Sequence, residues 1–150
     1  MKLIIPLAIA LLACNNNDAG NSQTQNQETI PLAQSKTVAQ EEQKVINITV
    51  DELLEKDGKF DGIILDVRTM GEVSEGLIPN AINIDFYDEQ FLNKVKELDH
   101  SKAILVYCRS GGRSAKAAQQ ILSLGFKQVY NLEGGMMEWN NKKGPIAMPK

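Results

Sequence analysis

Cys108 is the residue of this sequence best suited to nucleophilic chemistry. It opens a loop containing glycine and arginine, Cys108-Arg109-Ser110-Gly111-Gly112-Arg113-Ser114. The sequence has only two cysteines, and the other, Cys14, follows an N-terminal apolar run, Leu3–Ala13. The ending Leu11-Leu12-Ala13-Cys14 is typical of bacterial lipid-attachment sites, so we expect Cys14 to carry lipid. A lone remaining thiol in an exported protein indicates a reactive group rather than a structural disulfide.

The surroundings of Cys108 favour a thiolate. The apolar run 103–107 predicts a buried strand that ends at the cysteine, and Ser114 begins a predicted helix. Ligand sites in open α/β sheets lie beyond the carboxyl ends of strands, and free N–H groups at a helix start attract negative charge. Gly111 and Gly112 allow positive φ angles that turn backbone amides inward. We therefore expect the pKa of Cys108 to be lowered, to about 3.5–7.5.

Arg109 and Arg113 add positive charge to this loop, and guanidinium groups bind oxyanions with two donors each. They are therefore candidates for holding an anionic substrate. The alternative is a buried, inert cysteine, since free cysteine is often buried. A Gly-Gly turn, two arginines and a helix start close after Cys108 argue against it.

The elements that must position this loop follow an alternating strand and helix pattern from Val45 onward, which is typical of an α/β fold. We expect strands at 45–48, 62–67, 81–84, 103–107 and 129–132. Helices are predicted after Thr49, after Thr69, over 91–98, from Ser114 to just before Gly125, and around Trp139. Thr49 with Glu52, and Thr69 with Glu72, have the spacing of capping boxes.

We do not expect the N-terminal part to contribute to the core of this domain. Residues 1–13 have the charge and length of a signal peptide, with an apolar run too short to cross a bilayer. Residues 14–44 are rich in Asn, Gln, Ser and Thr, which predicts a flexible tether behind the lipid. The alternative is an ordinary cleaved secretory signal. We expect a folded domain at 45–150, anchored to the periplasmic face of the cell envelope, with the outer membrane as one possible location.

The composition of the sequence argues against some classes of binding partner. The net charge is -3 and no stripe of Lys and Arg is present, which argues against a nucleic-acid partner. A small acidic domain on a tether is most simply a monomer. His100 is the only histidine, and it precedes the strongest predicted strand, so we interpret it as a surface residue rather than a catalytic base.

Three motifs in order resemble those of single-domain rhodanese-like sulfurtransferases, and together they cover essentially the whole predicted domain. The first is the Cys108 loop itself. The second is Leu65-Asp66-Val67-Arg68 with Glu72, followed by 76–84, and the third is 131–135 with Trp139 and 144–146. The sequence departs from the family pattern at Leu77, where the family usually has His, and at Asn80, where it usually has Gly. We expect these departures to affect local packing more than chemistry.

The resemblance implies a rhodanese-like α/β fold, with a central, mostly parallel five-stranded sheet flanked by helices and the active loop after a central strand. It also implies sulfur transfer without a metal or cofactor. Cys108 would take a sulfane sulfur from a small donor anion such as thiosulfate and pass it to a thiol, a protein or cyanide. The loop residues Arg109, Ser110, Gly111, Gly112, Arg113 and Ser114 would bind the substrate. Asp66, Arg68 and Glu72 would support the loop.

Two other functions remain open from the sequence. Tyrosine phosphatases, dual-specificity phosphatases and certain arsenate reductases also use a cysteine loop at a helix start. The phosphatases place five residues between Cys and Arg, whereas four separate Cys108 from Arg113. The tighter loop fits a single sulfur atom better. The second alternative is a membrane-tethered persulfide carrier or redox partner, which would bind sulfur without rapid turnover.

Overall fold

The computed structural model describes residues 44–149, so the expectations for Cys14, the signal segment and the tether lie outside this range. A five-stranded sheet with the order β1-β5-β4-β2-β3 organises the described residues, and every strand pair is parallel. The strands are β1 (Ile46–Ile48), β2 (Ile63–Asp66), β3 (Ile82–Asn83), β4 (Ile104–Tyr107) and β5 (Val129–Leu132). The expected α/β fold with a five-stranded sheet is confirmed.

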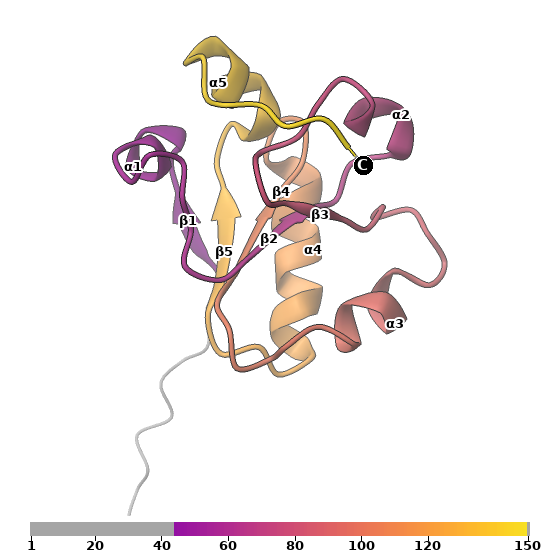
Figure 1. Ribbon diagram of the computed structural model, residues 1–150. Coiled ribbons are helices and arrows are strands. Elements are labelled where there is room, and N and C mark those ends of the chain that lie inside the picture. Colours follow the sequence, from indigo (N-terminus) through magenta and orange to yellow (C-terminus); the bar gives the residue numbers. More distant parts are fainter. Residues whose placement is uncertain (1–43, 150) are drawn as a thin grey trace, which may run out of the picture. The chain divides into compact units, whose positions relative to one another are not determined.

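Helices cover both faces of the sheet (Figure 1). They are α1 (Val50–Leu54), α2 (Met70–Val73), α3 (Phe91–Lys96), α4 (Gly112–Ser123) and α5 (Gly135–Asn141). One apolar cluster joins α3 and α4 to one face of the sheet, and a second joins α1 and α5 to the other. The domain therefore has three layers, and β4 lies in the middle of the central layer.

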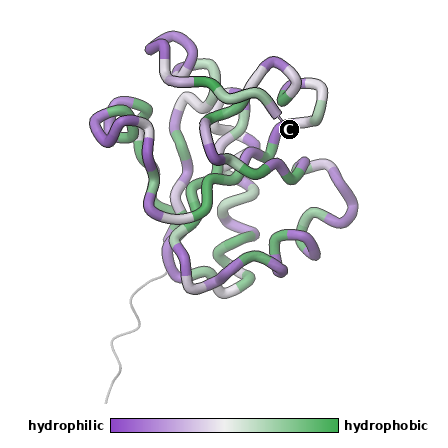
Figure 2. The backbone as a smooth tube through the Cα atoms, in the orientation of Figure 1, coloured by the Kyte–Doolittle hydropathy of each residue, from purple (hydrophilic) through white to green (hydrophobic). Residues whose placement is uncertain are grey.

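The central position of β4 follows from its sequence. All four of its residues are buried, which requires apolar side chains on both faces. Val106 belongs to the cluster under α4, while Leu105 and Tyr107 belong to the cluster under α1 and α5. Figure 2 shows this arrangement as hydrophobic strands inside a more hydrophilic outer layer of loops and helix surfaces. A central strand of this kind is a fixed support for the loop that follows it.

Capping boxes set the starts of α1 and α2. Thr49 with Glu52, and Thr69 with Glu72, form both reciprocal hydrogen bonds of a capping box, as predicted. The start of α4 differs from the expectation. The helix begins at Gly112 rather than at Ser114. Of the two glycines Gly111 and Gly112, only Gly111 has a positive φ, 94°. Ser114 therefore lies inside the first turn, where backbone amides have no partner within the helix.

Both departures from the family pattern are accommodated locally. Leu77 is 7% exposed and pairs with Ala147 through two backbone hydrogen bonds of 2.9 Å. Asn80 has a φ of 64°, a left-handed conformation in which Asn substitutes for Gly better than most residues do. In the described part of the chain, no helix has the length and apolar character needed to span a membrane.

Trp139 is fully buried, as expected of a core residue, and its indole N–H donates to the Pro145 carbonyl over 3.0 Å. A Cβ at Gly144 would lie 2.3 Å from the Trp139 ring. We predict that Gly144→Ala lowers the free energy of unfolding by about 1–3 kcal/mol through overpacking. Urea unfolding measures this change. Gly71→Ala is the matched control, because its Cβ meets no atom within 4 Å; an equal loss in both variants would contradict the prediction.

Candidate active site

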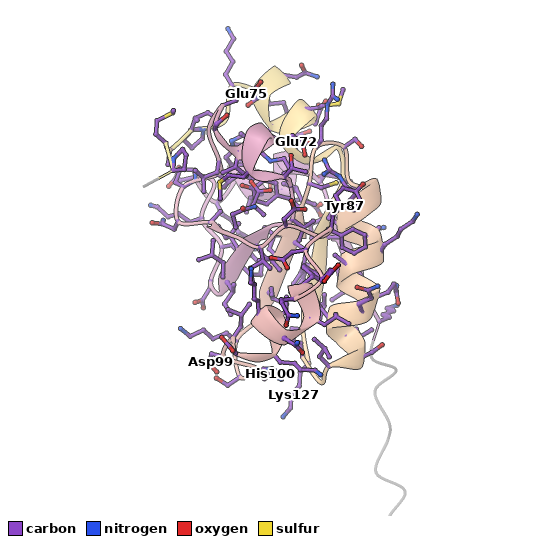
Figure 3. The ribbon with its side chains drawn as sticks, turned by 90° about the vertical axis from the view of Figure 1, so that its right-hand side faces the viewer. Glu72, Glu75, Tyr87, Asp99, His100 and Lys127 are labelled. Carbon is purple, nitrogen blue, oxygen red and sulfur yellow. The ribbon has the colours of Figure 1, made fainter. Side chains whose placement is uncertain are left out.

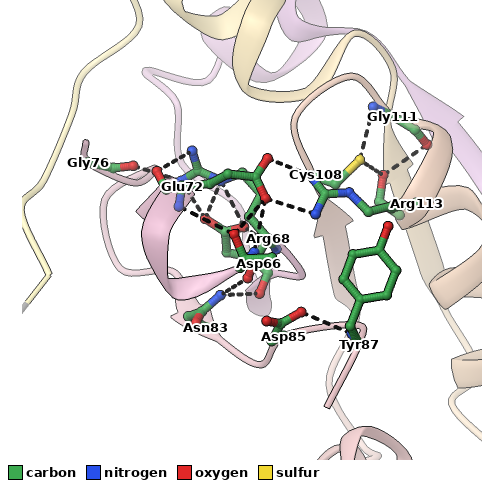
Figure 4. A network of polar contacts seen from close by, with 12 residues as sticks. Asp66, Arg68, Glu72, Gly76, Asn83, Asp85, Tyr87, Cys108, Gly111 and Arg113 are labelled. Atoms are coloured by element: carbon green, nitrogen blue, oxygen red, sulfur yellow. Dashed lines mark hydrogen bonds and ion pairs between the residues drawn. The ribbon is translucent and has the colours of Figure 1, made fainter. Parts of the chain in front are cut away.

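Cys108 directly follows β4, and its side chain is enclosed by the loop that leads into α4. The residue is 1% exposed. The Gly111 amide donates to the Cys108 Sγ over 3.2 Å, and the Ser114 hydroxyl lies 3.6 Å from the same sulfur (Figure 4). The left-handed conformation of Gly111 turns its amide toward the sulfur, because no Cβ opposes it. The loop thus surrounds the sulfur with donors.

The pKa of Cys108 lies below its ordinary value. Burial is the largest single influence and raises the pKa, because it disfavours the charged sulfur. Hydrogen bonds from the amide and hydroxyl of Ser114, and from the amides of Ser110 and Gly111, lower it by more in combination. The loop therefore favours the thiolate through hydrogen-bond donors despite burial.

Ser114 links the sulfur to the sheet. Its hydroxyl is fully buried and lies 2.6 Å from the Asn131 Oδ1 on β5 and 3.0 Å from the Gly111 carbonyl. The Asn131 side-chain amide in turn donates to Asn47 on β1 over 3.1 Å. Asn131 is not among the site residues predicted from the sequence. No local signal identifies it, because the contact requires that β5 lie beside β4.

The start of α5 fixes the backbone of the same loop. The amides of Met136 and Met137 donate to the carbonyls of Cys108 and Arg109, both over 2.9 Å. Gly135 permits this approach, because a Cβ there would lie 2.4 Å from the Cys108 carbonyl oxygen. With these carbonyls directed at α5, the loop amides remain free to face the sulfur.

Glu72 and Arg113 join α2 to the first turn of α4. The two terminal nitrogens of the Arg113 guanidinium meet the Glu72 carboxylate at 2.8 and 2.5 Å. The Arg113 guanidinium also lies 5.7 Å from the centre of the Tyr87 ring. The Arg113 hydrogen bond, followed by those of Thr69, lowers the pKa of Glu72 to about 2, although burial opposes the shift. The structure therefore holds Arg113 on Glu72, while its expected contact with substrate stays a prediction.

Asp66 and Arg68 form a second ion pair behind the first, buried at the end of β2. Their closest side-chain contact is 2.7 Å, and the exposed side-chain fractions are 0% and 4%. Arg68 also donates to the backbone carbonyls of Gly76 and Glu72, over 2.7 and 3.2 Å. Asp66 and Tyr107 are register partners on β2 and β4, which places this pair beside the strand that carries Cys108. These contacts fix the segment that presents Glu72.

Arg109 differs from Arg113 in having an exposed position. It lines a cavity of about 370 Å³ between α2 and α5, together with Arg68, Glu72, Glu75, Met136, Met137 and Asn140. The cavity lies beside the loop, and Cys108 is not among its lining residues. His100 is remote from it, since Figure 3 places His100 at the opposite end of the domain from Glu72 and Glu75. Its ring stacks on Phe126.

Of the sequence-predicted site residues in the described range, the structure brings Cys108, the loop that follows it and Glu72 into one connected network, with Asp66 and Arg68 directly behind (Figure 4). Asn131, Tyr87 and Gly135 join this site without having been predicted. Among residues 44–149, no group of three or more His, Cys, Asp or Glu side chains could hold a metal ion.

A parallel three-layer domain with a cysteine at the end of its central strand, and amides converging on the sulfur from a helix start, defines a class of cysteine-loop α/β proteins. The sequence pattern of the rhodanese-like domain matches residues 49–142. The chain belongs to this family. The predicted family and fold are therefore confirmed.

Individual relatives agree with this assignment. A protein named sulfurtransferase from Allochromatium vinosum is 31% identical over 90 residues, covering 60% of this chain and 82% of that protein. A tRNA uridine(34) hydroxylase from Cytophaga hutchinsonii is 39% identical over 87 residues, which cover 56% of this chain but only 28% of the hydroxylase. The crystal structure of a rhodanese-related protein from Thermoplasma volcanium has a TM-score of 0.61 and 32% identity, covering 69% of this chain and 99% of that one.

The Glu72–Arg113 pair generates a pH prediction. The pKa of Glu72 falls from 4.5 to about 2, so its ionised form stabilises the folded state above pH 4.5, and this contribution is lost as the pH falls toward 2. We predict that the stability difference between wild type and Glu72→Gln shrinks over this interval. Urea unfolding at a series of pH values measures it. A difference that stays constant from pH 6 to pH 2.5 would show that the pair does not stabilise the domain.

Proposed function

We propose that this protein is a sulfurtransferase that carries a sulfane sulfur as a persulfide on Cys108. The observation that carries the proposal is the convergence of loop donors on an otherwise buried sulfur, with the Gly111 amide at 3.2 Å. Such donors keep a thiol ionised at neutral pH, and an ionised thiol is a strong nucleophile without an added base. A family relative named sulfurtransferase supports the same chemistry.

In the first step, the Cys108 thiolate attacks the outer sulfur of a donor such as thiosulfate. A new S–S bond forms to Cys108, the S–S bond of thiosulfate breaks, and sulfite leaves with the bonding electron pair. The product is an anionic persulfide. We expect the amides that stabilise the thiolate to stabilise the charge on the terminal sulfur as well, as in an oxyanion hole.

In the second step, an acceptor thiolate or cyanide attacks the terminal sulfur, and Cys108 leaves as a thiolate. The acceptor gains one sulfur atom, and the protein returns to its starting state. Arg109 is the better candidate for attracting an anionic donor, because it lines the open cavity beside the loop. Arg113 is bonded to Glu72 through both terminal nitrogens and serves the loop by holding its position.

The phosphatase alternative gains no support from Arg113. A phosphate clamp needs guanidinium nitrogens facing the centre of the loop, and both terminal nitrogens of Arg113 are engaged by Glu72. A persulfide carrier would form the same Cys108 persulfide as a sulfurtransferase, and the two functions differ only in the rate of turnover.

We predict that wild type forms thiocyanate from thiosulfate and cyanide, and that Cys108→Ser loses this activity by at least 10³-fold, on the order expected for loss of a covalent nucleophile. Intact-mass spectrometry after thiosulfate treatment should show one added sulfur atom on wild type and none on Cys108→Ser. Cys14→Ser, the matched control for thiol loss, should retain both activities.

Three outcomes separate the alternatives. Thiocyanate formation at equal rates in wild type and Cys108→Ser would refute the proposal. A persulfide that forms on Cys108 but discharges only to a protein thiol would assign the carrier function. Hydrolysis of an aryl phosphate faster than thiocyanate formation would assign phosphatase chemistry.

We further propose that the domain is attached to the cell envelope through lipid on Cys14. The proposal rests on the Leu11-Leu12-Ala13-Cys14 ending and the polar stretch that follows it. We predict that wild type expressed in a Gram-negative host incorporates labelled palmitate and sediments with membranes. Cys14→Ser should lose the label and the sedimentation, whereas Cys108→Ser should keep both. A Cys14→Ser protein that still carries label would contradict this assignment.

A further inference from the structure

A hydrogen-bonded chain leads from the buried Ser114 of the active loop across two strands to an exposed residue. It runs from Ser114 on α4 to Asn131 on β5 and then to Asn47 on β1. The two asparagines are register partners in the parallel β1–β5 pair, so their side chains meet at the same height of the sheet. Ser114 and Asn131 are 0% and 4% exposed, which excludes water as the main partner of either side chain.

The Ser114 hydroxyl has one proton and three acceptors around it. The Asn131 Oδ1 lies at 2.6 Å, the Gly111 carbonyl at 3.0 Å and the Cys108 Sγ at 3.6 Å. A hydroxyl donates one hydrogen bond at a time. The shortest contact is the one to Asn131, and an amide oxygen is a better acceptor than a neutral thiol sulfur. The proton therefore points to Asn131 when Cys108 is protonated.

Asn47 fixes the direction of this arrangement. The Asn131 Nδ2 donates to the Asn47 Oδ1 over 3.1 Å, so the Asn131 oxygen is the atom that faces Ser114. We propose that Asn131, oriented by Asn47, is a positioning residue that competes with the Cys108 sulfur for the Ser114 proton and so weakens the hydrogen bond from this hydroxyl to the thiolate. The Ser114 Oγ then presents a lone pair to Cys108 and can accept its S–H. Asn131 thus acts on the pKa of Cys108 in the opposite direction to the loop amides, which lower it.

The consequence is a sulfur of intermediate acidity. An attacking thiolate loses nucleophilicity as its pKa falls, whereas a leaving thiolate departs faster. Cys108 has both roles in the proposed function, on which this consequence rests: it attacks the donor and later leaves the persulfide. Without Asn131, this competition ends and the Ser114 hydroxyl binds the charged sulfur more strongly, since hydrogen bonds to ionised acceptors are the stronger ones. Thiolate formation becomes easier and attack on the donor slower.

The test is the pH dependence of iodoacetamide alkylation, measured on the full chain carrying Cys14→Ser so that Cys108 is the single thiol. In this background we expect a midpoint below about 8.5, the unperturbed value. Asn131→Leu should lower the midpoint further, by about 0.5–1 pH unit, the size of one hydrogen bond. Replacing a polar side chain by an apolar one would on its own raise the midpoint by desolvation, so a purely structural role predicts the opposite sign.

Other charged groups around the loop stay unchanged in this comparison. They are Arg109 and Arg113 on the loop and α4, Glu72 on α2, Asp66 and Arg68 at the end of β2, Glu75 on the cavity wall, and Glu133 and Glu138 at β5 and α5. Ser114→Ala tests the route through the hydroxyl. In the Ser114→Ala background, Asn131→Leu should no longer lower the midpoint, because no proton remains to be redirected.

An Asn131→Leu midpoint that stays constant or rises, in a protein with a wild-type circular dichroism spectrum, would overturn the proposal. A decrease that persists in the Ser114→Ala background would overturn it as well. If Asn131→Leu does not fold, Asn47→Leu decides the question, because Asn47 is exposed on the edge strand. Asn47→Leu should also lower the midpoint, by a smaller amount. An unchanged midpoint would refute the proposed role of the hydrogen-bonded chain. Alkylation needs no sulfur donor. The test of Asn131 therefore gives a result even if the protein does not transfer sulfur, and failure of the proposed function is recognised separately.

Discussion

The central constraint on this site is that a negative charge on an enclosed sulfur must be balanced by hydrogen-bond donors. Cys108 is 1% exposed, and burial alone would favour the neutral thiol. The compensation comes from backbone amides at the start of α4, which have no partners within the helix. Their direction depends on where the loop carbonyls go. Because α5 binds the carbonyls of Cys108 and Arg109, the amides rather than the carbonyls face the sulfur.

Charge is arranged so that no unpaired carboxylate opposes the thiolate in this network. Asp66 is paired with Arg68, and Glu72 is paired with Arg113. The two pairs are connected, since Arg68 also binds the Glu72 carbonyl. All buried side-chain nitrogen and oxygen atoms of the described residues have a hydrogen-bond partner. The position of Arg113, and with it the first turn of α4, thus depends on a buried ion pair at the end of β2, the strand next to β4.

The parts of the site that the sequence predicted are those encoded by neighbouring residues. The buried strand before Cys108, the Gly-containing turn and the Thr69–Glu72 capping box are all local patterns. Asn131, Gly135 and Tyr87 were not predicted, because their contacts with Ser114, Cys108 and Arg113 depend on which elements become neighbours. The start of α4 was displaced by two residues for a different reason. Two consecutive glycines do not tell which one is left-handed, and the structure assigns that role to Gly111 alone.

A site that forms a persulfide must stabilise charge in two places in turn, first on Cys108 and then on the sulfur bonded to it. A single strong donor fixed on the Cys108 Sγ would favour the first state at the expense of the second. The donors to Cys108 are instead spread over Ser110, Gly111 and Ser114, so the proposed function does not depend on one fixed donor. A Ser114 proton held by Asn131 at 2.6 Å follows the same logic. It limits how tightly the loop binds the bare thiolate, so that charge can move outward when the donor sulfur arrives.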